Sequence, residues 1–130
     1  MKAYWDSSAL VEAVKDAALR ARLHKEKGIS RPHALSEVFC TLTGNPKLRF
    51  DAEYAARTVE QLADELEFCD LTPAEMIAAF KAARRKGVRG AHVHDLLHAA
   101  AADKSGAHEL LTLDQNDYAG LPEKATVVVL

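Results

Sequence analysis

The chain begins with a short apolar run that stops at an acidic residue. Residues 2–10 read Lys-Ala-Tyr-Trp-Asp-Ser-Ser-Ala-Leu, a pattern that predicts a buried strand with Asp6 at its carboxyl end. Ligands of open α/β sheets bind beyond the carboxyl ends of the strands, so an acid in this place faces a site. The plainer interpretation is that Asp6 caps the helix that follows. Alternation along the strand predicts that the ring of Trp5 points away from Tyr4 and Asp6, into a helix-covered face.

Helical periodicity alternates with short strand-like segments along the rest of the chain. The predicted helices cover about residues 9–27, 33–43, 52–66, 73–87 and 91–104, and the predicted extended segments cover 28–30, 67–71, 109–113 and 125–130. Gly28 is the expected residue directly after the first helix, and Thr72-Pro73-Ala74-Glu75 predicts a capping box. The β-branched run near the end of the chain predicts a strand buried on both faces.

This alternation predicts an α/β fold, in which a central parallel sheet is flanked by helices in a three-layer arrangement. The 130 residues are enough for a core without disulfides or structural metals, so we expect a single domain over residues 1–130. Cys40 and Cys69 lack a CxxC spacing and have apolar neighbours, which predicts small buried residues in a reducing cytoplasm. We find no signal-peptide layout and no apolar segment that could span a bilayer, so we expect a complete cytoplasmic protein without a membrane partner.

The net charge of −2 narrows the function classes. It argues against a protein that coats nucleic acid through bulk positive charge, so RNA or DNA binding would require local basic patches or metal ions. One such patch is a basic run before the last predicted helix, formed by Arg84, Arg85, Lys86 and Arg89. It is a candidate RNA-binding track, and the alternative is a solvated helix end favoured by the helix dipole.

Four acids occupy comparable positions in the predicted elements. Asp6 and Asp114 end strands, Asp95 lies near the start of a late helix, and Glu37 lies in the second helix. Strand ends and helix starts meet on one side of a parallel sheet, so these acids could line one crevice. Without a cation they would repel one another and raise each other's pKa values. Mg²⁺ or Mn²⁺ would resolve this conflict and could activate water for attack on a phosphodiester.

The same residues resemble the PIN domains, a family of metal-dependent ribonucleases, and most closely the small VapC-type toxins of toxin-antitoxin pairs. The matching motifs are Tyr4-Trp5-Asp6-Ser7-Ser8-Ala9-Leu10, Ser36-Glu37-Val38, Asp95-Leu96-Leu97-His98-Ala99-Ala100-Ala101 and Leu111-Thr112-Leu113-Asp114-Gln115-Asn116-Asp117-Tyr118. The resemblance implies that the catalytic, metal-binding acids are Asp6, Glu37, Asp95 and Asp114, supported by Asp117 and Thr112. Ser8 and His98 are two further candidates for supporting residues. Capping of the first helix then falls to Ser7 or Ser8.

The resemblance also implies an activity and a set of partners. The implied activity is endonucleolytic RNA hydrolysis by metal-activated water. The implied partners are an RNA substrate, with tRNA and rRNA among the candidates, a cognate antitoxin protein and a second copy of the chain in a homodimer. The alternatives are a PIN nuclease in RNA processing that is not a toxin, a PIN-like scaffold that binds without cutting, and a metal-free ribonuclease that uses two histidines. Asp117 has a plainer interpretation as well, as a turn residue that makes a local hydrogen bond.

His98 departs from the family pattern, which more often has an apolar residue at this position. It lies one helical turn after Asp95, so it could orient that carboxylate or contact a phosphate. The alternative is a polar residue at a partly exposed position. The segment His94-Asp95-Leu96-Leu97-His98 also resembles the zinc-binding HExxH motif, with aspartate in place of glutamate, which leaves a zinc metallohydrolase as a further alternative.

Overall fold

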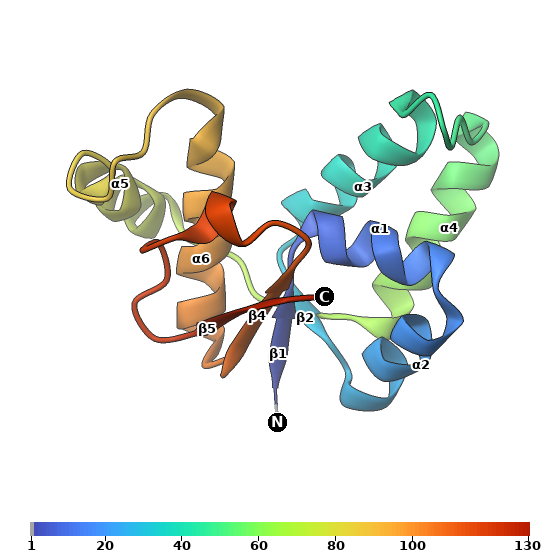
Figure 1. The fold of residues 1–130 in the computed structure, drawn as a ribbon, viewed down its shortest axis with the longest axis horizontal. Helices are drawn as coiled ribbons and strands as arrows, with labels where there is room; N and C mark the ends of the chain where they lie inside the picture. Colours follow the sequence, from blue (N-terminus) through green and yellow to red (C-terminus); the bar gives the residue numbers. More distant parts are fainter. Residues whose placement is uncertain (1) are drawn as a thin grey trace.

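The computed structural model describes residues 2–130, which form a five-stranded sheet in the order β3-β2-β1-β4-β5 (Figure 1). The strands are β1 (Ala3–Trp5), β2 (Ile29–Ser30), β3 (Glu67–Phe68), β4 (Glu109–Thr112) and β5 (Thr126–Val129). All four neighbouring pairs are parallel. The carboxyl ends of the strands therefore share one edge of the sheet, as the alternation of strands and helices predicts.

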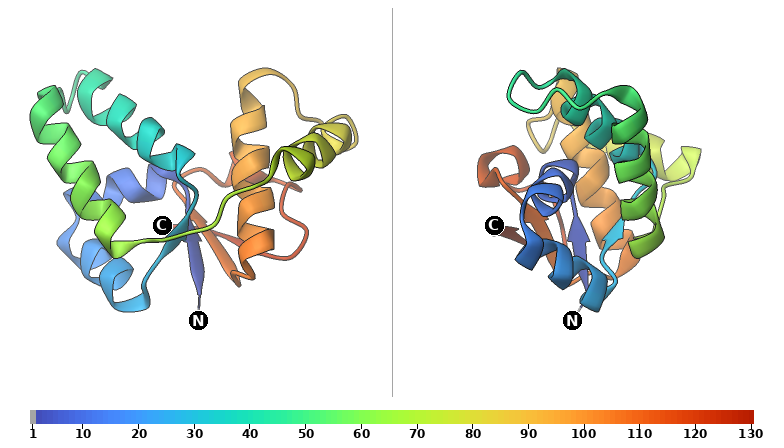
Figure 2. Two further views of the ribbon diagram at one scale, coloured as in Figure 1. Left: turned by 180° about the vertical axis from the view of Figure 1, so that it is seen from behind. Right: turned by 90° about the vertical axis from the view of Figure 1, so that its right-hand side faces the viewer.

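Helices cover both faces of this sheet (Figures 1 and 2). One face carries α1 (Ser7–Lys15), α2 (Ala17–Glu26), α3 (His33–Gly44) and α4 (Ala52–Glu65). The other face carries α6 (Val93–Ser105), with α5 (Pro73–Ala82) packed on its outer side. The short 3-10 helices η1 (Gly90–His92) and η2 (Gln115–Tyr118) precede α6 and follow β4. The predicted three-layer α/β/α fold is confirmed.

Two cores lie on opposite faces of β1 because successive strand residues point in opposite directions. Trp5 is fully buried in the core that α1, α3 and α4 cover, together with Leu10, Leu42 and Leu62. Tyr4 is fully buried in the second core, under α6. The predicted orientation of Trp5 is confirmed, and β1 thus joins both layers directly before Asp6.

The structure differs from the predicted helices at three ends. The first predicted helix is two helices, because Asp16 ends α1 and caps α2 by accepting bonds from the N–H groups of Ala18 and Leu19. Helix α2 ends at Glu26, and the next residue, Lys27, has the left-handed backbone conformation that was expected for Gly28. The predicted capping box at Thr72 is confirmed, but α5 ends at Ala82 and turns replace its predicted last residues up to 87.

Two predictions of burial are wrong, one for the last strand and one for the two cysteines. The last strand, β5, lies at the edge of the sheet, and both of its terminal residues are exposed instead of buried. Cys40 is exposed on α3 and Cys69 is partly exposed, so apolar neighbours in sequence did not predict their burial. Among the described residues 2–130, no helix has the length and apolar character that a membrane crossing requires.

Candidate metal centre

Asp6 lies where β1 ends and α1 begins, and its side chain is almost fully buried at 4% exposure. Its backbone N–H donates to Leu111 on the neighbouring strand β4. The carboxylate Oδ1 accepts bonds from the backbone N–H of Ala9, at 2.8 Å, and from the hydroxyl of Ser8, at 2.7 Å. Asp6 is therefore the N-cap of α1, and the prediction that Ser7 or Ser8 takes this role is wrong. Both cap bonds end on Oδ1, so Oδ2 is not committed to the cap.

Ser8 ties the end of β1 to the end of β4. Its Oγ accepts a bond from the backbone N–H of Leu113, at 3.0 Å, and lies 3.3 Å from Oγ1 of Thr112. Thr112 in turn accepts a bond from the backbone N–H of Asp114. These two hydroxyl residues support the site structurally, because they hold the chain segments that carry Asp6 and Asp114 against each other.

Asp95 lies in the first turn of α6 and is half-buried. The pKa of its carboxyl is raised to about 6, chiefly by burial and also by the negative charges of Asp117 and Asp6, while His92 and His98 act against the shift. The structure thus brings Asp95, Asp6 and Asp117 close enough for their charges to interact. A carboxyl with neighbouring carboxylates and a raised pKa is typical of functional sites.

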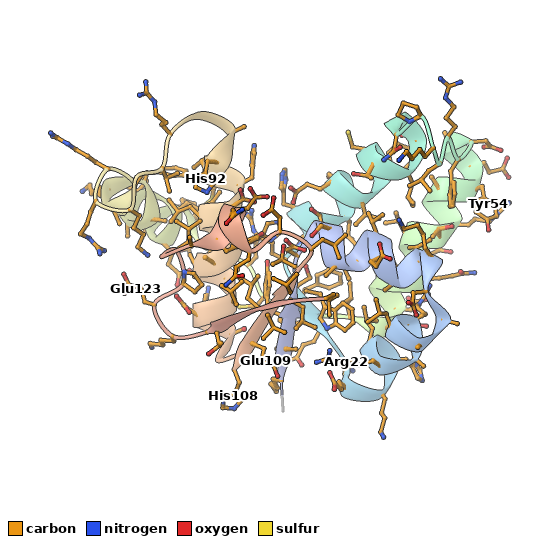
Figure 3. All side chains as sticks on the ribbon, viewed as in Figure 1. Arg22, Tyr54, His92, His108, Glu109 and Glu123 are labelled. Carbon is orange, nitrogen blue, oxygen red and sulfur yellow. The ribbon has the colours of Figure 1, made fainter. Side chains whose placement is uncertain are left out.

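The two acids of the segment after β4 have different surroundings. Asp114 is exposed, and its Oδ1 accepts a bond from the backbone N–H of Asn116 as the cap of η2. Asp117, one turn later, is the acid with the largest charge effect on Asp95, although the resemblance assigns the ligand role to Asp114. The carbonyl oxygen of Asp117 lies 2.7 Å from Nε2 of His92, which Figure 3 labels beside η2.

His98 is 1% exposed, so the expected partly exposed position is wrong. Its Nε2 lies 2.7 Å from Oε1 of Glu37, and its Nδ1 lies 2.7 Å from the hydroxyl of Tyr4. The partner of His98 is therefore Glu37 on α3 and not the predicted Asp95. Burial acts to raise the pKa of Glu37, but the hydrogen bond from His98 and the neighbouring histidine side chains outweigh it and hold the pKa below its ordinary value. Tyr4 was not identified from the sequence as part of this site. The available signal was the alternation along β1, which turns Tyr4 toward the layer of α6, the helix that carries Asp95 and His98.

The HExxH-like pattern is not supported by this arrangement. Both ring nitrogens of His98 are hydrogen-bonded, whereas a zinc ligand needs one of them for the metal. The ring of His94 stacks on His33 of α3, with ring centroids 5.5 Å apart. The two histidines of the pattern thus have different environments and do not converge on one point.

Asp6 and Asp117 lie near enough to Asp95 for their charges to act on it, but the described acids do not form a finished metal-binding cluster. Within residues 2–130, no three His, Cys, Asp or Glu side chains stand at the spacing of a preformed metal site. The donor set nevertheless fits a hard divalent cation, because it consists of carboxylate oxygens, which Mg²⁺ and Mn²⁺ prefer. The pKa of Asp95, raised by burial and then by the charges of Asp117 and Asp6, gives the same indication, because a bound cation would stabilise the ionised carboxylate against both effects.

The basic run after α5 is divided between structural and exposed side chains. Lys86 donates to the carbonyl oxygen of Leu121 at 2.7 Å and pairs with Glu123, so its ammonium group holds the loop before β5. Arg85 pairs with the same glutamate at 3.2 Å. Arg84 and Arg89 are exposed. The run is therefore partly a loop anchor and not a uniform track of cations.

Comparison with known proteins identifies the family. The PIN domain model matches residues 3–122, so the chain belongs to the PIN domain family, whose members are generally metal-dependent nucleases. No match was found among curated proteins.

Solved structures support the fold. PAE2754 from Pyrobaculum aerophilum superposes with a TM-score of 0.73 at 22% identity, covering 98% of this chain and 90% of that one. VapBC2 from Rickettsia felis, bound to a DNA fragment from its promoter, gives a TM-score of 0.73 at 18% identity, covering 100% and 99%. A domain of a functionally unknown protein from Methanocaldococcus jannaschii gives 0.56 at 15% identity, covering 99% and 90%.

Proposed function

We propose that this PIN-domain protein is an endoribonuclease that depends on Mg²⁺ or Mn²⁺ and acts as the toxin of a toxin-antitoxin pair. The observation that carries the proposal is the convergence of Asp6, Asp95 and Asp117 at the carboxyl edge of the parallel sheet, with the pKa of Asp95 raised to about 6. Such a site favours a bound cation, because the carboxylates repel one another without it.

Each acid would contribute in a different way to holding the metal. Asp6 and Glu37 are fixed by protein hydrogen bonds to one carboxylate oxygen each, which leaves the second oxygen for a cation. Asp95 would supply the charge that is least compensated in the metal-free protein. Asp114 would complete the set, with Asp117 as the supporting acid. A bound Mg²⁺ or Mn²⁺ would supply an activated water and offset the negative charge of the phosphodiester.

The substrate and partners follow from the same proposal. RNA would approach an acidic edge, so phosphate contacts must come from exposed cations, and Arg84 and Arg89 are candidates. A cognate antitoxin is supported by the likeness to the VapBC2 complex, and a homodimer is proposed from the resemblance to VapC-type toxins. The cytoplasm is the proposed place of action.

Metal-dependent cleavage tests the proposal directly. A panel of structured RNAs, with matched DNA, is incubated with the protein in Mg²⁺, Mn²⁺ or EDTA. We expect cleavage of RNA only with metal, and loss of at least about a hundredfold in rate for Asp6→Asn and Asp95→Asn, as for other residues that hold the reacting groups. Glu60→Gln is the matched control, because Glu60 is an exposed acid of α4. Full activity of Asp95→Asn would contradict the proposal, and binding without cleavage would favour the scaffold alternative.

A second comparison decides between the two acids of η2. Asp114→Asn and Asp117→Asn are assayed side by side for Mn²⁺ affinity and RNA cleavage. If Asp114 is the ligand, its variant loses more metal affinity, whereas a greater loss in Asp117→Asn would transfer the role to the acid that acts on Asp95. Toxicity on expression, relieved by the Asp6→Asn substitution, would distinguish the toxin from a housekeeping RNA-processing nuclease.

A further inference from the structure

The residue with the most complete set of contacts at the site is His98, which none of the proposed chemical steps uses. It is 1% exposed and lies on α6, in the layer that covers one face of the sheet. Its hydrogen-bond partner Glu37 lies on α3, in the opposite layer. The bond between them therefore spans the two helical layers beyond the carboxyl ends of the strands.

Glu37 decides which nitrogen of His98 must carry a proton, because a carboxylate can only accept and the proton between the two groups therefore belongs to Nε2. The third member of the network is Tyr4, which is fully buried and whose hydroxyl can donate or accept. This hydroxyl can donate to Nδ1 of His98, at 2.7 Å. The neutral ring with its proton on Nε2 satisfies every partner, because Nε2–H donates to Oε1 of Glu37.

This arrangement has a direct consequence for Glu37. Its side chain is 27% exposed, so without a fixed partner it could turn toward solvent from α3. The bond from His98 holds Oε1 and leaves Oε2 for another partner at the acidic edge. Groups that hold the ligands of a metal in this way are known to determine both ligand orientation and metal affinity.

We infer that His98 is a positioning residue: with Tyr4 behind it, the ring fixes Glu37 in the orientation that binds the divalent cation. The inference rests on the proposed metal-dependent function. It assigns to His98 no contact with substrate and no proton transfer. An apolar residue at position 98 could fill the same volume but could not orient Glu37, so a purely structural role and a positioning role predict different results.

Metal binding to the metal-free protein tests the inference without any assay of activity. Mn²⁺ affinity is measured by calorimetry and by electron paramagnetic resonance for the wild type, His98→Leu, His98→Gln and Tyr4→Phe. We expect roughly 10–100-fold weaker binding for His98→Leu, the effect typical of losing such a partner. His98→Gln retains an N–H donor and should recover much of the affinity, and Tyr4→Phe should fall between the two. Equal affinity of the wild type and His98→Leu would overturn the inference.

A double-substitution comparison shows whether the effect passes through Glu37. In the Glu37→Gln background, His98→Leu should cause no further loss of Mn²⁺ affinity, because there is no carboxylate left to orient. An undiminished loss in that background would overturn the inference and indicate a general structural effect. Circular dichroism of each variant accompanies the measurement. If His98→Leu does not fold, Tyr4→Phe carries the test, because it removes one bond to His98, and an Mn²⁺ affinity equal to that of the wild type would then overturn the inference.

The protonation state of His98 gives a third, metal-free measurement. Two-bond ¹H–¹⁵N spectra of the imidazoles, with His98 assigned from the signal lost in His98→Gln, should show the proton on Nε2. A neutral ring with its only proton on Nδ1 would overturn the inference, because Nε2 could then not donate to Glu37. Failure of the proposed function is distinguishable from failure of this inference. If the wild type binds Mn²⁺ with an affinity that depends on His98 and Glu37 but cleaves no RNA, the nuclease is refuted and this inference stands.

Discussion

The substitution Gly28→Ala tests how closely β1 is packed before it delivers Asp6 to the site. A Cβ atom at residue 28 would lie 2.7 Å from Nε1 and 2.8 Å from Cδ1 of Trp5. Trp5 is fully buried and its ring is enclosed by the core of the α1–α4 layer, so it cannot move aside without disturbing neighbours. Gly28 has no left-handed backbone conformation, which means that the space beside the indole is what requires glycine here.

Two opposing effects set the magnitude. Overpacking a dense core costs about 1–3 kcal/mol. Replacing glycine by alanine also restricts the unfolded chain, which stabilises by about 0.4–1 kcal/mol. The net loss is therefore about 0.5–2 kcal/mol. With an unfolding entropy of about 2.1 cal/mol/K per residue, the 130-residue chain should melt roughly 2–7 °C lower.

Thermal unfolding and intrinsic fluorescence measure this effect together, because Trp5 is the only tryptophan in the sequence. Gly44→Ala is the matched control, since a Cβ there meets nothing within 4 Å and the residue lies at the end of α3. We expect Gly44→Ala to leave the Trp5 emission unchanged and, since only the effect on the unfolded chain remains, to raise the melting temperature by roughly 1–4 °C. A Gly28→Ala protein that melts with the wild type and has the same emission would refute the reasoning about this contact.

Three further predictions follow from single contacts. Asp103→Ala removes the acceptor of three backbone N–H groups at residues 123–125 and should cost about 1–3 kcal/mol by urea unfolding. Thr72→Ala removes one half of the capping box with Glu75 and should speed amide hydrogen exchange in the first turn of α5, at a cost of about 1 kcal/mol to that helix. The folded pKa of Asp95 is raised to about 6, so ionising this carboxyl should lower the stability of the metal-free protein as the pH rises from 4 to 7. Mn²⁺ should reverse this loss at pH 7. Melting temperatures in EDTA and in Mn²⁺ measure both effects.

Local signals predicted the fold well wherever one residue type decides the structure. The capping box at Thr72 and the alternation that separates Tyr4 from Trp5 depend on neighbours in sequence, and the structure confirms both of them. The edge position of β5 depends on strand order, which no local pattern contains. Gly28 shows the difference within one residue: the helix signal predicted a C-terminal glycine, whereas the structure places the left-handed residue at Lys27 and uses Gly28 for its missing side chain.

The site could be predicted as a set of acids but not as a set of contacts. Positions at strand ends and helix starts were enough to select Asp6 and Asp95, whose charges interact in the structure. The partner of His98 could not be obtained from helical spacing, which favoured Asp95 as the near neighbour. The partner is instead Glu37, 61 residues away on the opposite layer, and only the packing of α6 and α3 across the sheet edge brings the two together.

Three of the four proposed ligands have one feature in common: a single oxygen of each carboxylate is held by hydrogen bonds from the protein. Oδ1 of Asp6 is held by α1 and Ser8, Oε1 of Glu37 by His98, and Oδ1 of Asp114 by Asn116. Among the described residues, no such bond to the Asp95 side chain is present, and Nε2 of His92 lies 3.9 Å from its Oδ2. Asp95 is also the acid whose pKa is raised. The three held carboxylates would therefore present oriented oxygens to a divalent cation, and Asp95 would supply most of the electrostatic stabilisation. Removing a holding bond should weaken metal binding gradually, whereas removing the charge of Asp95 should abolish it.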